Sequence, residues 1–230
     1  MTAASGGIVA EGLTRRFGVV TALDGVSFHV PANERFALLG ANGAGKSTLL
    51  GILTTLAMPR AGTAIVAGFD VRTAASEVRR RIGVLAHSPM VYEELSPLEN
   101  LQFFARLYGI PHPDSRIEAL LRRVGLWSRR FEPARVFSRG YHQRLAIARA
   151  LVHEPVVLLL DEPETGLDSE ALELLDELML CAPGLTVLAA THRRERVDHW
   201  ATGVLELDRG RVLNSTLTST PLRVIEGRTA

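Results

Sequence analysis

The chain has 230 residues, among them 26 basic and 25 acidic side chains, 47% hydrophobic residues and a single cysteine. The length fits one large domain, or one domain with an inserted lobe, and the composition is that of a globular protein. The net charge of +1 argues against a general nucleic-acid binder and against direct binding to anionic membranes. The lone Cys181 excludes an internal disulfide and fits a reducing compartment.

The sequence shows no pattern of a signal peptide or of a membrane-spanning segment. The first residues, "MTAASGGIVAEG", lack a charged region followed by an apolar one, so no signal peptide is expected. The longest apolar runs, such as residues 156–160, are far too short to span a bilayer. We therefore expect any action at a membrane to depend on a partner.

The first third of the chain alternates short strand-like runs with turns. Residues 7–17, 26–30, 35–40 and 62–68 are predicted strands, because β-branched or aromatic residues stand between Gly, Pro and Asn. A helix is predicted over 46–56, after a second glycine cluster, and another short strand over 81–86.

The middle of the chain has the pattern of a compact all-helical insert. One helix is predicted to begin at Pro97 with Ser96 as its N-cap, because apolar residues follow at positions 98, 101, 104, 105 and 108. A second helix has Asp114 as a candidate cap and Gly125 as its stop, and a third begins within residues 137–151.

The last third returns to alternating strands and helices. Residues 155–163 and 185–192 contain buried-type strands, residues 169–180 an amphipathic helix, and residues 202–214 a hairpin that turns at "DRG". Strands that alternate with helices predict an α/β fold with a mainly parallel, doubly wound sheet.

A glycine-rich loop between a predicted strand and a predicted helix has the pattern of a phosphate-binding loop. Residues 40–47 read G-x-x-x-x-G-K-S, and such a loop turns backbone N–H groups toward a phosphate at a helix N-terminus. Ser47 is predicted to place its hydroxyl on Mg²⁺, and Thr48 to add a phosphate contact. The other residues predicted to line the phosphate are Asn42, Gly43, Ala44 and Gly45.

Lys46 is the only lysine of the chain, and the other 25 basic residues are arginine. A flexible ammonium reaches between two phosphates, whereas a broad, planar guanidinium fits a phosphate loop poorly. The placement of this one lysine supports the phosphate-binding prediction independently of the glycines.

Two other predicted strands end in ionisable residues. Asp161 and Glu162 follow five apolar residues, and the carboxyl ends of such strands face the ligand crevice of an α/β sheet. We expect Asp161 to hold Mg²⁺ through water and Glu162 to polarise an attacking water. His192 ends the strand within 185–192, where a neutral imidazole can hold the γ-phosphate and that water.

The order of these motifs resembles the ATP-binding cassette of ABC transporters over about residues 7–217. "GANGAGKST" resembles Walker A, "VVLLLDEP" Walker B, "TGLD" the D-loop and "TH" the switch histidine, while "FSRGYHQR" occupies the signature position. The resemblance implies a P-loop NTPase with an antiparallel β subdomain and an inserted helical subdomain. It also implies one ABC ATPase domain: a nucleotide-binding core at 7–86 and 153–217, a helical subdomain at 87–152 and a C-terminal tail at 218–230.

The resemblance also implies ATP and Mg²⁺ as ligands and further site residues. Phe17 matches the aromatic residue that stacks on adenine, although the sequence alone favours a core aromatic there. Ser138, Gly140 and the D-loop Asp168 join the nucleotide site. In this family two cassettes form a head-to-tail dimer that sandwiches two ATP molecules between Walker A and the signature, and an integral membrane permease binds them on the cytoplasmic side.

Two positions depart from the family pattern. The signature is commonly Leu-Ser-Gly-Gly-Gln, whereas Phe137, Arg139 and Tyr141 stand here beside Ser138 and Gly140. His87 replaces a glutamine whose oxygen reaches Mg²⁺ and the attacking water. Mg²⁺ prefers oxygen ligands, so His87 is expected either to act through a water or to be an ordinary loop histidine.

Residues 87–110 and 137–168 are most similar to the haem exporter ATPase of cytochrome c maturation, so export of haem is expected. The alternatives are an exporter ATPase for drugs, antibiotics or lipids, and a soluble ABC ATPase of DNA repair or translation. Soluble relatives usually carry long coiled coils or two cassettes, and this chain has neither pattern. A GTPase or kinase is disfavoured because the chain lacks an Asn-Lys-x-Asp motif.

Overall fold

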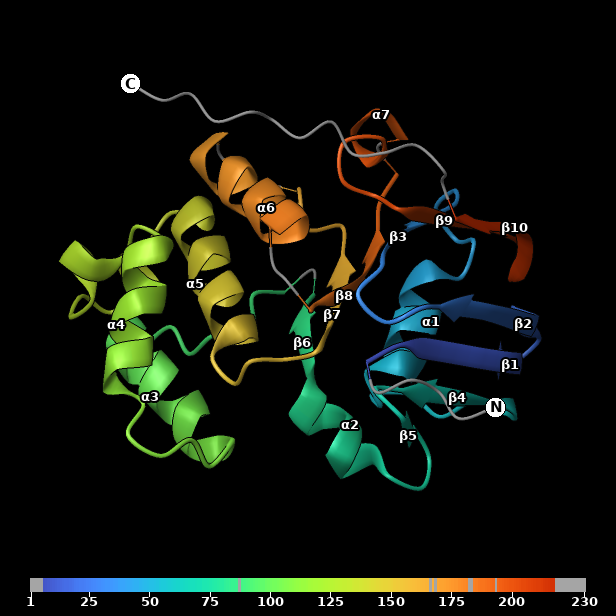
Figure 1. Cartoon of the computed structure of the whole chain (residues 1–230), viewed down its shortest axis with the longest axis horizontal. Helices are drawn as coiled ribbons and strands as arrows, with labels where there is room; N and C mark the ends of the chain where they lie inside the picture. Colours follow the sequence, from blue (N-terminus) through green and yellow to red (C-terminus); the bar gives the residue numbers. More distant parts are fainter. Residues whose placement is uncertain are drawn as a thin grey trace.

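The computed structural model describes residues 6–217, except residues 87, 166, 168, 182–183 and 193. Its strands form two sheets (Figure 1). The smaller sheet is antiparallel and has the order β2-β1-β4-β5. Its strands are β1 (Ile8–Phe17), β2 (Val20–Val30), β4 (Ala61–Val66) and β5 (Phe69–Asp70).

The larger sheet has six strands in the order β10-β9-β3-β8-β7-β6. All of its neighbouring strands are parallel except the β9–β10 hairpin. They are β3 (Arg35–Leu39), β6 (Ile82–Leu85), β7 (Val157–Asp161), β8 (Thr186–Ala190), β9 (Gly203–Asp208) and β10 (Arg211–Leu217). The predicted doubly wound, mainly parallel sheet with an added antiparallel sheet is therefore confirmed.

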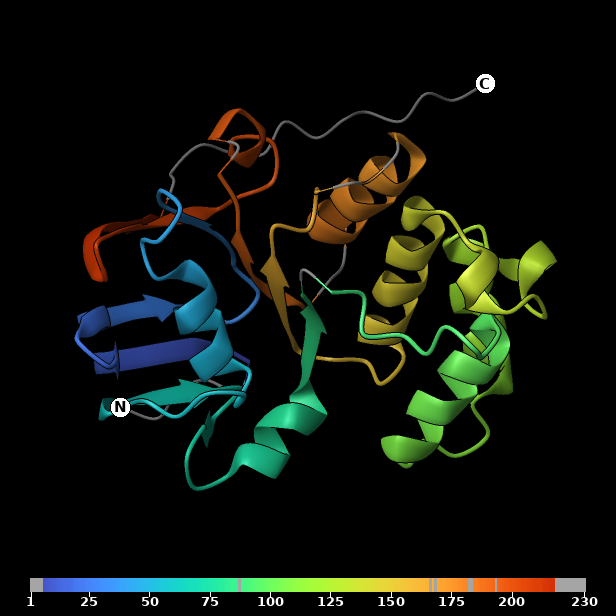
Figure 2. The ribbon, with the colours of Figure 1, turned by 180° about the vertical axis from the view of Figure 1, so that it is seen from behind.

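The helices cover both faces of the larger sheet, as the two opposite views show (Figures 1 and 2). The helix α1 packs between the two sheets, whereas α3, α4 and α5 form a separate helical group on the other side of β6–β8. The described helices are α1 (Lys46–Leu53), α2 (Ala75–Arg81), α3 (Pro97–Leu107), α4 (Asp114–Arg123), α5 (Arg139–Leu151), α6 (Ser169–Cys181) and α7 (Arg194–Val197), with short 3-10 helices η1 (Trp127–Arg129) and η2 (Ala134–Val136).

The central strands are apolar throughout because they are buried on both faces. Along β7, Val157 and Leu159 face the cluster around α1, while Leu158 and Leu160 face the cluster under the helical group. Strand β8 alternates in the same way. This arrangement explains why the sequence shows continuous apolar runs here rather than apolar–polar alternation.

Capping chemistry sets the starts of two helices as predicted. Ser96 and Glu99 form a reciprocal capping box at the start of α3, and Ser138 Oγ accepts a hydrogen bond from Tyr141 N, 3.4 Å away, at the start of α5. The prediction for Asp114 is wrong. Pro113 occupies the N-cap position of α4 and Asp114 is the first helical residue, where its negative charge favours the helix dipole.

Other element boundaries also differ from the prediction. Helix α1 ends at Leu53 rather than at residue 56, because Thr54 caps it and Thr55 turns into the left-handed region at φ 64°. Strand β2 begins at Val20, six residues before the predicted run. The short α2 occupies residues directly before β6, and sequence patterns did not indicate it.

Candidate functional site

The carboxyl ends of β3, β7 and β8 meet at one edge of the larger sheet. Strand registers pair Leu38 with Ala190, and Ala190 with Asp161. The glycine-rich loop leaves β3, Glu162 directly follows β7, and His192 is the second residue after β8. The sheet therefore brings the three predicted motifs together although more than 140 residues separate the first from the last in sequence.

The backbone of the glycine-rich loop requires glycine at its two ends. A Cβ atom on Gly40 would lie 2.4 Å from the carbonyl oxygen of Leu207, and one on Gly45 would lie 2.6 Å from that of Ala22. Both glycines have positive φ, 154° and 107°, which L side chains rarely adopt. Strands β9 and β2 thus press against the loop and hold it in shape.

Lys46 is buried, and its ammonium lies over the loop. Its Nζ donates hydrogen bonds to the carbonyl oxygens of Gly40 at 2.7 Å and Ala41 at 3.3 Å. Ser47, by contrast, is exposed at the first turn of α1, and Thr48 is half-buried. The ammonium and the hydroxyl therefore both stand at the N-terminus of one helix, as a phosphate with its Mg²⁺ requires.

The remaining loop residues differ in exposure. Asn42 and Gly43 are exposed, whereas Ala44 is buried. The carbonyl oxygen of Ala44 accepts a hydrogen bond from Gly210 N at 2.9 Å, and Gly210 O accepts one from Asp24 N at 2.8 Å. The β9–β10 turn thus holds the glycine-rich loop through a backbone hydrogen bond, and no sequence motif indicated this contact.

Glu162 and His192 face each other across the sheet edge. Their Oε1 and Nδ1 atoms lie 3.5 Å apart, and Glu162 N donates to the carbonyl oxygen of Ala190 at 2.9 Å. Glu162 adopts a left-handed backbone at φ 49°, which is unusual for a glutamate and typical of functional turns. The partly buried Asp161 ends the strand beside them.

These groups fit Mg·ATP. The bare backbone at Gly40 and Gly45 leaves a cradle that a Cβ would fill, Lys46 supplies a cation, and Ser47 and Asp161 supply the oxygen atoms that Mg²⁺ prefers. Among the described residues, no group of three or more His, Cys, Asp or Glu side chains is arranged to hold a metal ion. The two oxygen donors, Ser47 and Asp161, suit a Mg²⁺ that also takes phosphate and water oxygens as ligands.

The signature residues lie away from this edge. Ser138 is exposed and Gly140 buried at the start of α5. Figures 1 and 2 show α5, which Ser138 caps, and α1, which follows the glycine-rich loop, on opposite sides of β7 and β8.

The structure explains Tyr141, which occupies the signature position where glutamine is usual. Its ring lies 5.5 Å from that of Phe137, and the guanidinium groups of Arg129 and Arg144 lie 5.0 and 5.4 Å from its centroid. Tyr141 thus packs into the helical group through cation–π contacts. Arg139 is exposed, and within the described part of the chain the structure shows no hydrogen bond or ion pair for its side chain.

The three remaining predicted residues belong to another element or lie outside the described chain. Phe17 ends β1 and is 52% exposed, so it is not the core aromatic that the sequence alone favoured. An exposed ring at a strand end is free to stack on a base, while Arg15 lies 4.8 Å from its centroid. His87 and the D-loop Asp168 lie outside the described residues.

A buried carboxylate beside the site went unnoticed in the sequence. Glu164 follows Glu162 by two residues and accepts a hydrogen bond from the Thr191 hydroxyl. In the sequence, "PETG" is typical of a polar turn, and nothing in that pattern indicates burial.

Comparisons with known proteins agree with this arrangement. A family model described as ABC transporter matches residues 23–165. The Nod factor export ATP-binding protein I of Ralstonia nicotianae is 38% identical over 87% of this chain and 64% of its own length. The daunorubicin resistance ATP-binding protein DrrA3 of Streptomyces coeruleorubidus is 40% identical over 90% of this chain and 66% of its own.

A third relative is covered more fully. The ABC transporter ATP-binding protein NatA of Bacillus subtilis is 39% identical over 85% of this chain and 81% of its own length. The chain thus spans slightly less than two thirds of the first two relatives. Among solved structures, the ATP-binding subunit of an ABC transporter superposes with a TM-score of 0.84 at 29% identity, over 91% of this chain and 89% of that one.

Proposed function

Because this chain belongs to the ABC transporter family of ATP-binding, ATP-hydrolysing proteins, we propose that it is the ATPase of an exporter for a drug, antibiotic or lipid-like substrate. The observation that carries the ATPase role is the meeting of the glycine-rich loop, Asp161, Glu162 and His192 at one sheet edge. In this proposal Glu162 polarises the attacking water and His192 holds the γ-phosphate.

The relatives favour this substrate class over haem. Two of them are named for Nod factor export and daunorubicin resistance, and neither name mentions haem or cytochrome c. The expectation of haem export therefore finds no support in these comparisons. Since the chain spans only part of those relatives, the transported substrate and the partners are inferred here from likeness alone.

We further propose that two ATPase chains act together, each supplying half of each site. The placement of α5, which Ser138 caps, and of α1, which follows the glycine-rich loop, on opposite sides of β7 and β8 supports this arrangement. Closure of the dimer around two Mg·ATP then drives a membrane permease, and hydrolysis reopens it.

The segment after β6 is the proposed contact with that permease. Met90 and Tyr92 are 45% and 51% exposed, and the Tyr92 ring lies 4.9 Å from that of Phe103 on α3. This exposed apolar surface belongs to the link between the larger sheet and the helical group, where a partner can sense their relative motion. No helix of the described chain has the length and hydrophobicity to cross a bilayer, and we propose a location at the cytoplasmic face of the membrane.

The test is deletion of the gene in its own host. We expect the strain to become sensitive to one or more compounds in a panel of anthracyclines, peptide antibiotics and lipid-like toxins, while its c-type cytochromes stay at normal levels. Resistance should return with the intact gene but not with Lys46→Ala. A tagged chain should copurify with one multi-span membrane protein.

The other outcomes separate the alternatives. Loss of c-type cytochromes without new drug sensitivity would overturn the proposal in favour of haem export. Normal phenotypes together with a chain that copurifies with no membrane protein would favour a soluble ATPase.

A further inference from the structure

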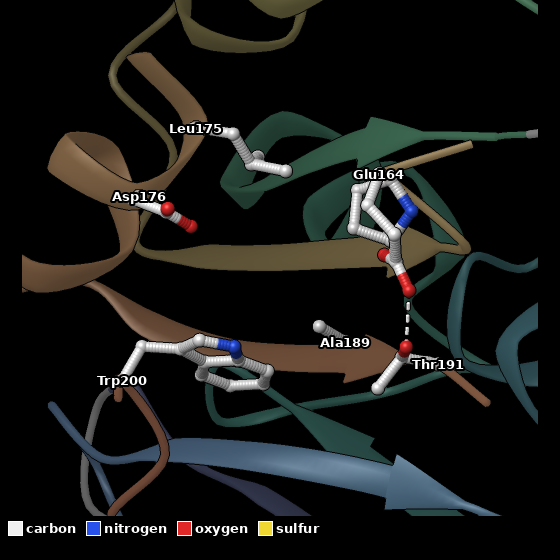
Figure 3. Close-up of a pocket in the computed structure, with 7 residues that line it drawn as sticks. Glu164, Leu175, Asp176, Ala189, Thr191 and Trp200 are labelled. Carbon is white, nitrogen blue, oxygen red and sulfur yellow. Dashed lines mark hydrogen bonds between the residues drawn. The ribbon is translucent and has the colours of Figure 1, made fainter. Parts of the chain in front are cut away.

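Glu164 is a carboxylate buried where an apolar residue would be expected. It is 7% exposed and lines a small pocket with Pro163, Leu175, Ala189 and Trp200, in which Asp176 also stands (Figure 3). Burying a carboxylate costs free energy unless hydrogen bonds compensate for its lost hydration. Glu164 therefore needs a hydrogen-bond donor in the same pocket.

That partner is Thr191, the residue directly before His192. Thr191 is 4% exposed, and its hydroxyl donates to Glu164 Oε1, the bond drawn in Figure 3. Its backbone N–H donates to the carbonyl oxygen of Leu38 at 3.1 Å, one residue before the end of β3. Thr191 is thus fixed between the strand that leads to the glycine-rich loop and the turn that follows β7.

The segments after β7 and β8 are joined at two points around the functional pair. A backbone hydrogen bond links Glu162 N to Ala190 O at 2.9 Å, and the side-chain hydrogen bond links Glu164 to Thr191. The turn between these points is closed by a hydrogen bond from Thr165 N to Glu162 O at 3.0 Å. Such a double attachment restricts both segments in position and in rotation.

His192 needs such support because packing does not hold it. Its side chain is 51% exposed, whereas that of Glu162 is 27% exposed, and their 3.5 Å separation depends on where the two segments run. Small displacements of a group that contacts the reacting atoms are costly to rate.

We propose that Glu164 is a positioning residue that, through its buried hydrogen bond with Thr191, holds His192 in register with Glu162 for ATP hydrolysis. Glu164 need not contact ATP or the attacking water. This inference rests on the roles proposed above for Glu162 and His192, and it adds a residue to that site for which the sequence motif gave no reason.

The test compares matched variants of the full-length chain in steady-state hydrolysis of Mg·ATP. Glu164→Ala and Thr191→Val remove the hydrogen bond, whereas Glu164→Gln and Thr191→Ser keep an acceptor and a donor. We expect the first two to lower kcat about tenfold, with KM for ATP changed less than about twofold, because a hydrogen bond to a charged group is typically worth about one factor of ten or more. The two conservative variants should retain most of kcat.

A double-mutant test separates positioning from general destabilisation. In a His192→Ala background, Glu164→Ala should lower the residual rate by less than about twofold, because the group it positions is already gone. Glu177→Ala removes an exposed carboxylate from the neighbouring α6 and should leave kcat unchanged. In ¹⁵N NMR spectra, the signals of the His192 ring are assigned by their absence in His192→Ala. Their chemical shifts should change in Glu164→Ala but not in Glu164→Gln.

The proposal is overturned if Glu164→Ala retains full kcat. It is also overturned if Glu164→Ala lowers kcat by the same factor in the His192→Ala background as in the native chain. It is also overturned if both alanine and glutamine variants lose activity in step with their melting temperature. A different result would show that the roles proposed for Glu162 and His192 are wrong: Glu162→Gln and His192→Ala would then both hydrolyse ATP at the normal rate.

Discussion

At the scale of single residues, Gly45 illustrates how tightly the glycine-rich loop is built. It combines a φ of 107° with a carbonyl oxygen 2.6 Å from where its Cβ would stand, whereas Gly43 combines a φ of 81° with open space. Both positions disfavour alanine through their backbone, but only Gly45 also meets a steric barrier. A comparison of alanine substitutions at Gly43 and Gly45 therefore separates the cost of backbone strain from the cost of a steric clash.

We predict that Gly43→Ala lowers the free energy of unfolding by about 1 kcal/mol, the cost of a left-handed alanine. Gly45→Ala should lower it by about 2 kcal/mol more, because the loop must also move away from Ala22 on β2. Urea denaturation followed by circular dichroism measures both. Equal losses in the two variants would show that the contact with β2 relaxes without cost.

Residue-scale prediction from sequence succeeded where chemistry follows a fixed spacing. The single lysine and the glycines of residues 40–47 identified the loop because each type has one physical reason to stand there. Glu164 and Tyr141 were not foreseeable, since their roles come from partners at positions 191 and 129, far along the chain. A polar residue in a predicted turn gives no information on whether its side chain is buried.

At the scale of elements, local signals decided what the sequence could predict. The start of α3 was readable because a capping box and a proline stand before an amphipathic run. Helix α2 was missed because it has only seven residues, ends in three arginines and buries only Val78. Tertiary contacts with its neighbours, rather than periodicity, keep such a helix in place.

His153 links three elements and should make stability depend on pH. It lies between α5 and β7, stacks on Tyr108 with ring centroids 3.8 Å apart, and contacts the carbonyl oxygen of Ile82 through Nε2 at 2.9 Å. Burial, together with the smaller effects of the charges on Arg116 and Arg149, lowers the pKa of His153 to about 4, despite the raising effect of the Ile82 contact. The folded state thus prefers the neutral ring.

A lowered histidine pKa stabilises the fold above the unfolded value near 6.5 and loses that contribution as the pH falls toward 4. Between pH 6.5 and 4.5 we expect the free energy of unfolding to drop by about 2 kcal/mol more in the native chain than in His153→Phe. Urea denaturation at a series of pH values measures this difference. Parallel pH profiles for the two proteins would contradict it.

At the scale of the whole molecule, the fold divides the expected ATP site between two places. The larger sheet gathers Lys46, Asp161, Glu162 and His192, while the helical group carries Ser138 on the far side of β7 and β8. In the two-chain arrangement proposed above, a second chain brings its own Ser138 to the glycine-rich loop, and dimerisation is then expected to depend on ATP.

A block in hydrolysis should therefore trap the dimer. Glu162→Gln removes the proposed general base and keeps the side-chain size, so with excess Mg·ATP it should elute from size exclusion at twice the mass of one chain. The native protein, which turns ATP over, should elute mainly as a monomer.

Adding either Lys46→Ala or Ser138→Arg to Glu162→Gln should abolish the dimer. Lys46→Ala acts on the half of the site at the glycine-rich loop, and Ser138→Arg on the half at the start of α5. Ser138→Arg is suited to this because its position is exposed and loses only a helix cap, worth about 1 kcal/mol. A Glu162→Gln chain that stays monomeric, or a Ser138→Arg double variant that still dimerises, would exclude the two-chain site.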